Sequence, residues 1–220
     1  MAIPTTASFK LTFDELLDAA QARVGGEQMS GYDGRAAKRA YQIMEAHWAN
    51  LGIQMWSVTK FTATISEGQT EHVMPADCVD VNDVSLITNA ANPEITTVMN
   101  RVGRGNYQSI SNKASRGAPN QFFVDRQQAA VNIYLFPAPN RDYNITGWYR
   151  RRLKDVVSFT DDLDIPFRYT EAAIAGLAYY LSKEGKTKIP AEIRKELEAD
   201  YRLILSEAQD GDTDMSPWSI

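Results

Sequence analysis

The sequence predicts an α+β fold: helices from both chain ends form a four-helix bundle, and an antiparallel β-rich domain is inserted between the two helical pairs. Two observations predict it. Apolar residues recur with a helical period near both ends and alternate in between, and 220 residues, 44% hydrophobic and 23% charged, can bury a sizeable core. The expected parts are an N-terminal αα-hairpin (1–55), a β-rich domain (56–154), a C-terminal helical pair (155–209) and an extended tail (210–220).

The N-terminal helices are signalled by their ends. Thr12 and Glu15 form a capping box, and Gly25-Gly26 stops the first helix. The second helix runs from about Asp33 to Asn50, with Gly52 just past its end. The apolar residues of each helix share one face, which predicts an αα-hairpin. They are Phe13, Leu16, Leu17, Ala20 and Val24 in the first helix, and Ala37, Ala40, Tyr41, Met44, Trp48 and Leu51 in the second.

Six or seven strands are expected in the middle of the chain, where apolar and polar residues alternate. Residues 100–120, rich in Gly, Ser, Asn and Arg, are predicted to be a long basic loop with one helical turn. Loops of this length in compact domains are usually functional or disordered. The expected strands are 56–65, 71–74, 79–88, 94–99, 121–125, 130–136 and 143–153.

The C-terminal pair begins after an acidic segment. Pro166 suits the first position of a helix over 167–183, which is apolar almost all round and therefore expected to be buried on all sides. Pro190 opens the fourth helix, and the tail 210–220 is expected to be extended. The apolar stripe of the fourth helix is Ile189, Ile193, Leu197, Tyr201, Ile204 and Ala208.

Charge is segregated along the chain. Residues 1–100 carry a net charge of −6, residues 101–154 carry +8 and residues 155–220 carry −7. A basic middle between acidic ends has several explanations that the sequence leaves open: contact with an acidic neighbouring subunit, contact with a partner or DNA phosphates, or balance of the acidic ends within the fold. The candidate residues are Arg101, Arg104, Arg116, Arg150, Arg151 and Arg152.

Catalytic and metal-binding signatures are sparse. His47 and His72 are better explained as helix-face and strand residues than as bases, and Cys78 has no histidine near it in sequence. A single cysteine also excludes an intrachain disulfide framework and a multi-cysteine zinc site. No catalytic residue, metal or cofactor is therefore expected.

Asp161, Asp162 and Asp164 favour a role at the N-terminus of the next helix, because carboxylates suit the helix dipole there. A hydrolase that uses these three carboxylates is the weaker alternative. Residues 1–10 lack the pattern of a signal peptide, and no apolar run approaches the length of a membrane span, so a cytosolic origin and no membrane contact are expected.

The last residues carry an unusual apolar group. Trp218 follows an acidic segment that is too polar to fold alone, and it either docks in a partner's pocket or folds back on its own domain. The candidate docking residues are Met215, Pro217, Trp218 and Ile220.

Several short motifs occur in an order and spacing that resemble the head-to-tail adaptor (connector, or upper tail tubular) proteins of tailed bacteriophages. The resemblance covers about residues 12–208. The motifs are Trp48-Ala49-Asn50-Leu51-Gly52, Val73-Met74-Pro75-Ala76-Asp77, the loop from Arg104 to Tyr107, Gly117-Ala118-Pro119-Asn120, Ile133-Tyr134-Leu135-Phe136-Pro137-Ala138-Pro139, Tyr149-Arg150-Arg151 and the segment from Asp161 to Pro166.

The resemblance implies a structural virion component at the head-tail junction, assembled in the bacterial host cytoplasm. In that family a ring of usually twelve subunits docks beneath the portal protein, extends the DNA channel and supports the next tail component, a nozzle or stopper. DNA passes through only transiently, during ejection. The C-terminal segment commonly reaches the portal, which here implies the tail with Trp218, and the six arginines would lie at subunit interfaces or in the channel. A DNA-contacting binding protein that uses the basic 101–152 region is the alternative function.

Overall fold

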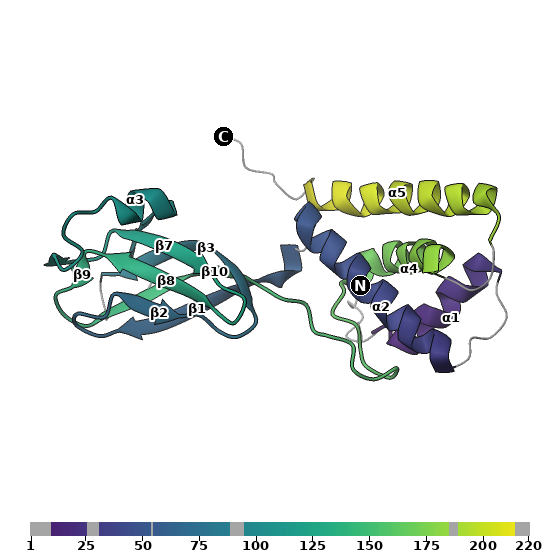
Figure 1. Ribbon diagram of the computed structural model, residues 1–220, viewed down its shortest axis with the longest axis horizontal. Helices are drawn as coiled ribbons and strands as arrows, with labels where there is room; N and C mark the ends of the chain where they lie inside the picture. The colour runs from purple at the N-terminus through teal and green to yellow at the C-terminus, as the bar shows by residue number, and fades with distance from the viewer. Residues whose placement is uncertain (1–9, 26–30, 54, 89–94, 185–188, 214–220) are drawn as a thin grey trace, which may run out of the picture. The chain divides into compact units, whose positions relative to one another are not determined.

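The chain folds into two compact units (Figure 1). The structure, a computed structural model, describes residues 10–25, 31–53, 55–88, 95–184 and 189–213. The helical unit combines Met1–Gln54 with Leu153–Ile220, and the β unit is Met55–Arg152. The predicted α+β class is confirmed, with five α-helices and largely antiparallel sheets among the described residues.

One helix, α4, forms the centre of the helical unit. It lies between α5 on one side and α1 and α2 on the other, and it contacts all three (Figure 1). Its small residues permit this close packing: a Cβ atom added to Gly176 would lie 2.5 Å from Met44 Sδ and 2.8 Å from a ring carbon of Tyr201. The α-helices of this unit are α1 (Phe13–Val24), α2 (Gly31–Leu51), α4 (Thr170–Glu184) and α5 (Ala191–Thr213).

The predicted capping box of α1 and the predicted glycines just past the ends of α1 and α2 are confirmed, while α2 begins at Gly31, two residues earlier than predicted. Glu15 Oε2 accepts the backbone N–H of Thr12 at 3.1 Å, and Gly25 and Gly52 adopt the left-handed conformation with φ of 72° and 73°. The two helices touch where the Phe13 and Tyr41 rings meet edge to face, with centroids 5.6 Å apart. Helices α1 and α2 each also pack on α4, so their apolar faces contact α4 as well as each other.

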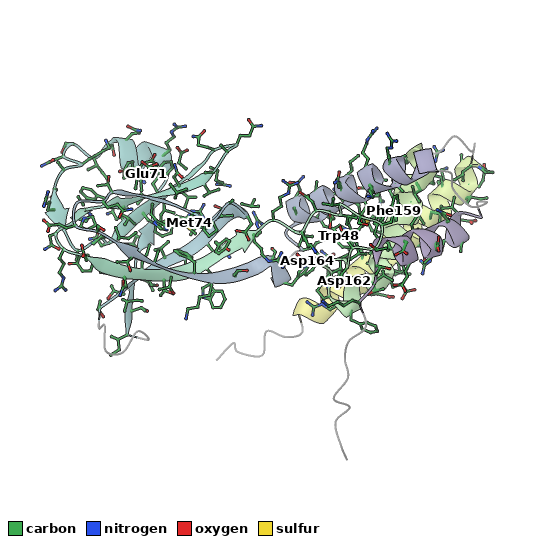
Figure 2. All side chains as sticks on the ribbon, turned by 90° about the horizontal axis from the view of Figure 1, so that it is seen from below. Trp48, Glu71, Met74, Phe159, Asp162 and Asp164 are labelled. Atoms are coloured by element: carbon green, nitrogen blue, oxygen red, sulfur yellow. The ribbon has the colours of Figure 1, made fainter. Side chains whose placement is uncertain are left out.

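An N-terminal helix and a C-terminal helix are joined in the core of the helical unit. Trp48 lies on α2 and is fully buried (Figure 2). Its indole N–H donates to the Tyr201 hydroxyl of α5 at 2.7 Å. This bond joins two helices separated in the sequence by the whole β unit.

The β unit contains two four-stranded sheets, whose buried faces share one core, and a small two-stranded sheet. Sheet one has the order β1-β10-β3-β4, all antiparallel, and sheet two has the order β2-β8-β7-β5, in which β5 and β7 are parallel. The strands of sheet one are β1 (Val58–Ile65), β10 (Tyr143–Arg151), β3 (Cys78–Ile87) and β4 (Thr96–Val98). Those of sheet two are β2 (Glu71–Val73), β8 (Val131–Phe136), β7 (Gln121–Arg126) and β5 (Asn100–Arg101).

Glycine is required at one point of sheet one. A Cβ atom at Gly147 would lie 2.2 Å from the carbonyl oxygen of Asp83 and 2.9 Å from a ring carbon of Phe61. The register then shifts between Trp148 and Tyr149, where β3 holds one extra residue. Trp148 stays 45% exposed on the outer side of the sheet.

The predicted number of strands was too low, since ten occur among the described residues. The additional ones are short: β5, and the parallel pair β6 (Arg116–Gly117) and β9 (Ala138–Pro139). Two-residue strands carry no alternation that a sequence pattern could reveal. The expected helical turn of the long loop is α3 (Arg104–Gln108).

Two predicted helix boundaries were also wrong. Pro166 caps a 3₁₀ turn, Phe167–Tyr169, so α4 begins after that turn rather than at the proline. Helix α5 continues to Thr213, and 210–213 are therefore helical rather than extended. No proline interrupts this segment, and a single Gly211 costs a helix only about 1 kcal/mol.

Candidate functional site

Arg101 is held within its own unit. Its Nη1 donates to the Val81 carbonyl oxygen at 2.7 Å, and its Nη2 lies 2.9 Å from Asp80 Oδ1. Arg126 Nε approaches the same carboxylate oxygen at 3.7 Å. Because Arg101 lies on β5 and Asp80 on β3, this ion pair connects the two sheets.

Arg150 is a further neighbour of Asp80, since the two residues are register partners on β10 and β3. Arg150 and Arg151 are half-buried, while Arg152 is exposed. The backbone N–H of Arg152 donates to the Asp77 carbonyl oxygen at 2.7 Å, which fixes the chain just after β10. The structure therefore brings Arg101 and Arg126 to the Asp80 carboxylate and places Arg150 opposite Asp80 on the neighbouring strand.

Arg104 and Arg116 lie elsewhere on the β unit. Arg116 forms an exposed ion pair with Glu67. Arg104 is the exposed first residue of α3 and forms no ion pair with another described residue. Helix α3 is anchored on sheet two by Tyr107, whose ring stacks on Phe123 with centroids 5.6 Å apart.

A polar and aromatic patch on sheet two extends this anchor. The Tyr107 ring also meets the Tyr134 ring at 5.8 Å. Glu71 Oε1 accepts the Tyr134 hydroxyl at 3.0 Å and the Asn132 side-chain amide at 2.8 Å (Figure 2). The hydrogen bond to Glu71 raises the pKa of Tyr134. The sequence contained no motif that singled out this patch.

The net charges of the two folded units differ from those of the three segments of the sequence. The β unit contains ten Lys and Arg against eight Asp and Glu, a net charge of +2, and the rest of the chain has thirteen against twenty, a net charge of −7. The basic middle is diluted because carboxylates from before residue 100, such as Asp80 and Glu67, fold beside it. No pattern in the sequence singles out Asp80, because its arginine partners are far from it in the chain.

The acidic segment ahead of α4 organises a loop. Asp161 Oδ2 accepts the backbone N–H groups of Val157 and Ser158 at 2.9 and 2.7 Å, and these bonds lower the pKa of that carboxyl. Asp164 accepts the backbone N–H of Lys154 at 3.3 Å (Figure 2). These bonds of Asp161 and Asp164 are to loop amides ahead of the helix that the sequence predicts they cap.

The third carboxylate of this segment, Asp162, lies 3.4 Å from Lys10 Nζ, and its backbone bridges to Thr12 (Figure 2). Within the described ranges, no group of three or more His, Cys, Asp or Glu is placed to hold a metal ion.

The remaining nucleophile and base candidates have the features of structural residues. Cys78 is buried, and burial together with the nearby Asp77 and Asp80 raises the pKa of its thiol to about 11. Burial lowers the pKa of His72, and His47 is exposed on α2. None of the helices in the described part of the chain combines the length and the hydrophobicity of a membrane span.

The predicted portal-binding residues, Met215, Pro217, Trp218 and Ile220, lie outside the described residues. The structure therefore leaves their role as a prediction.

A family model described as SU10 adaptor protein matches residues 11–220. The matched range takes in all described helices and strands of both units, so the match does not rest on one of them alone. No curated protein matches the chain.

Proposed function

Because the chain belongs to the SU10 adaptor protein family, a family of phage head-to-tail adaptors, we propose that it is a structural protein of the virion that joins the capsid to the tail. The observation that carries this proposal is the extent of the match, residues 11–220. The protein acts by assembly, and its surfaces are its functional sites.

The proposed assembly is a ring of twelve subunits beneath the portal protein. The ring extends the DNA channel and presents a platform to the next tail component, a nozzle or stopper. DNA passes through it only transiently, and assembly takes place in the bacterial host cytoplasm. The family membership supports the adaptor role, and the ring, its symmetry and its partners are our extension of it.

Each part of the chain is proposed to have its own role in the assembly. Residues 1–55 and 155–209 build a four-helix bundle, and residues 56–154 form an inserted domain that faces neighbouring subunits and the tail. The Trp48–Tyr201 hydrogen bond supports this organisation, because it joins helix α2, from before the β unit in the sequence, to helix α5, from after it.

The exposed arginines are proposed to serve subunit interfaces or the channel wall. Arg104 is the best candidate, since it is exposed on the β unit and forms no ion pair with another described residue, whereas Arg101 already binds Asp80. Arg152 is exposed as well. A channel that lets DNA slide should bind it weakly, so few exposed cations are needed. Arg116, Arg150 and Arg151 complete the proposed set.

The C-terminal tail is proposed to anchor the ring on the portal protein. Trp218 would fill an apolar pocket, and an aromatic of its size contributes roughly 2–3 kcal/mol when buried. Pro217 reduces the chain entropy lost on docking. Twelve weak tails on one ring act together through effective concentration, so each can bind weakly.

Electron microscopy of the purified protein, alone and mixed with the portal protein, tests the adaptor role. The expected result is a ring on the portal whose symmetry is directly countable. A protein that forms no ring under either condition, and instead binds DNA with a steep salt dependence, would favour the alternative of a DNA-contacting protein.

Deletion of 215–220 tests the tail. The truncated protein should keep its melting temperature but lose attachment to the portal protein in a pull-down assay. The matched control is Ser216→Ala, which changes the tail but keeps the four candidate docking residues, and it should leave attachment unchanged. Normal attachment of the truncated protein, or its unfolding, would contradict the role of the tail.

A further inference from the structure

Sheet one has two edges without a partner strand among the described residues. Its order is β1-β10-β3-β4, so β1 and β4 each pair on one side only. All three pairings are antiparallel, which makes β1 and β4 run in opposite directions. A second copy of the sheet, placed beside the first in the same orientation, therefore brings its β1 antiparallel to the first copy's β4.

The β4 edge is open to solvent on both faces of the sheet. Thr96, Thr97 and Val98 are all exposed, and Val98 is 69% exposed. The backbone N–H of Met99 donates to Val84, and Ile95 accepts from Thr88.

These two bonds define which residues of β4 point toward β3. In an antiparallel pair, backbone groups of alternate residues face the neighbour. Thr97, midway between Ile95 and Met99, therefore bonds toward β3, and Thr96 and Val98 direct their N–H and C=O groups to the open edge.

The open edge of sheet one at β1 is longer than the one at β4. Val58–Ile65 contains eight residues without proline, most of them β-branched or aromatic types that favour strands. Its outward side chains, Lys60, Thr62 and Thr64, are exposed. Proteins usually protect such edges with charges, proline or bulges, and Lys60 is the only charged residue here.

We propose that β4 of one subunit pairs antiparallel with β1 of a second copy of this chain, so that sheet one continues from subunit to subunit. The pairing uses a different edge on each copy. Such a heterologous contact repeats around a ring, whereas pairing of like edges stops at a dimer. This inference rests on the proposed ring and identifies a surface that builds it.

The faces of the sheet agree with this pairing. Val98, Ser85, Thr146 and Thr62 are successive register partners across sheet one, so Val98 and Thr62 lie on the same outer face. Continuing the sheet places an outer-face residue of β4 beside an outer-face residue of the next β1. The short β4 supplies few hydrogen bonds, so one contact is weak and closure of the ring stabilises all of them together.

Disulfide trapping tests the pairing directly. Val98→Cys is combined in turn with Lys60→Cys, Thr62→Cys and Thr64→Cys, so that each exposed outer-face position of β1 is tested as its partner. Within one subunit, Val98 and Thr62 are three strands apart, about 14 Å at the usual strand spacing, which is too far for a disulfide. Any bond between the introduced cysteines therefore joins two subunits. The native Cys78 is buried and stays in place.

The cross-linking is done on assemblies formed with the portal protein and inspected by electron microscopy. At least one double variant should give a ladder of covalent multimers on non-reducing gels, and Val98→Cys alone should give none. The matched control combines Val98→Cys with Thr146→Cys, which lies on the same face but on the interior strand β10. It should stay monomeric.

The other outcomes overturn the inference. Rings that form but do not cross-link in any double variant would exclude pairing of β4 with β1 and leave the adaptor role intact. Dimers from Val98→Cys alone would indicate pairing of two β4 edges. If no ring forms on the portal, the proposed function fails and this inference fails with it.

Discussion

The hydrogen bond between Trp48 and Tyr201 should be a major determinant of the stability of the helical unit. Trp48 is fully buried, Tyr201 is 4% exposed, and the donor and acceptor atoms are 2.7 Å apart. Burial raises the pKa of Tyr201 to about 12, so its hydroxyl is neutral at ordinary pH and can accept from the indole. A double-mutant cycle of Trp48→Phe and Tyr201→Phe measures the coupling between the two groups.

The structure predicts the size of each effect. Tyr201→Phe leaves a buried indole N–H without its acceptor, which costs about 1–3 kcal/mol of the free energy of unfolding. Trp48→Phe leaves the hydroxyl without its donor and also opens a cavity, for a total of about 2–4 kcal/mol. The double variant removes both polar groups, so its loss should be smaller than the sum of the single losses by about 1–2 kcal/mol.

Urea unfolding followed by circular dichroism at 222 nm checks this prediction, because four of the five described α-helices lie in the helical unit. The matched control is Trp148→Phe, at a position that is 45% exposed on the β unit, which should change stability by no more than about 0.5 kcal/mol. Single-variant losses that add without any coupling would refute the argument, since the bond would then contribute nothing beyond packing.

Four further predictions concern the packing within each of the two units. Gly176→Ala should destabilise the helical unit by about 1–3 kcal/mol in urea unfolding, because its Cβ would lie 2.5 Å from Met44 Sδ, whereas Gly103→Ala, with no atom within 4 Å, should be nearly neutral. The Cys78 thiol, with its pKa raised from 9.0 to about 11, should react slowly with iodoacetamide at pH 8 until the β unit unfolds. The folded protein favours the protonated form of the Cys78 thiol, so the protonated thiol contributes to the free energy of unfolding. That contribution is complete below about pH 9 and is lost as the pH rises toward 11. Cys78→Ala should reduce this loss of stability at high pH. Residues 55–152 expressed alone should unfold cooperatively on heating, because they contain their own core, and a chain without near-ultraviolet dichroism would contradict this.

Local signals in the sequence were sufficient for most helix ends and strands. The Thr12–Glu15 capping box and the glycines at 25 and 52 act within one turn of helix, so the backbone nearby decides the outcome. The segment 167–183 is apolar almost all round, and this correctly predicted that most of α4 is buried, although Phe167 ahead of α4 is 76% exposed. Alternation likewise identified the long strands, since a sheet with one buried face imposes a period of two on its side chains.

The candidate surfaces depended on contacts between distant residues. Sequence composition suggested a strongly basic middle, but Asp80 and Glu67 fold beside Arg101 and Arg116 and reduce the charge of the β unit to +2. The open edges of sheet one, β1 and β4, appear only once the order of the strands is known.

What the sequence determined by itself is therefore the class of fold, the positions of most elements and the family resemblance, because these follow from periodicity, caps and motif order along the chain. Only the tertiary structure decided which charges meet, which strands lie at an edge and which helix is central. Pairing of strands and packing of helices join residues far apart in the chain, as Trp48 and Tyr201 show, and no local pattern encodes which distant partner will fill a given place.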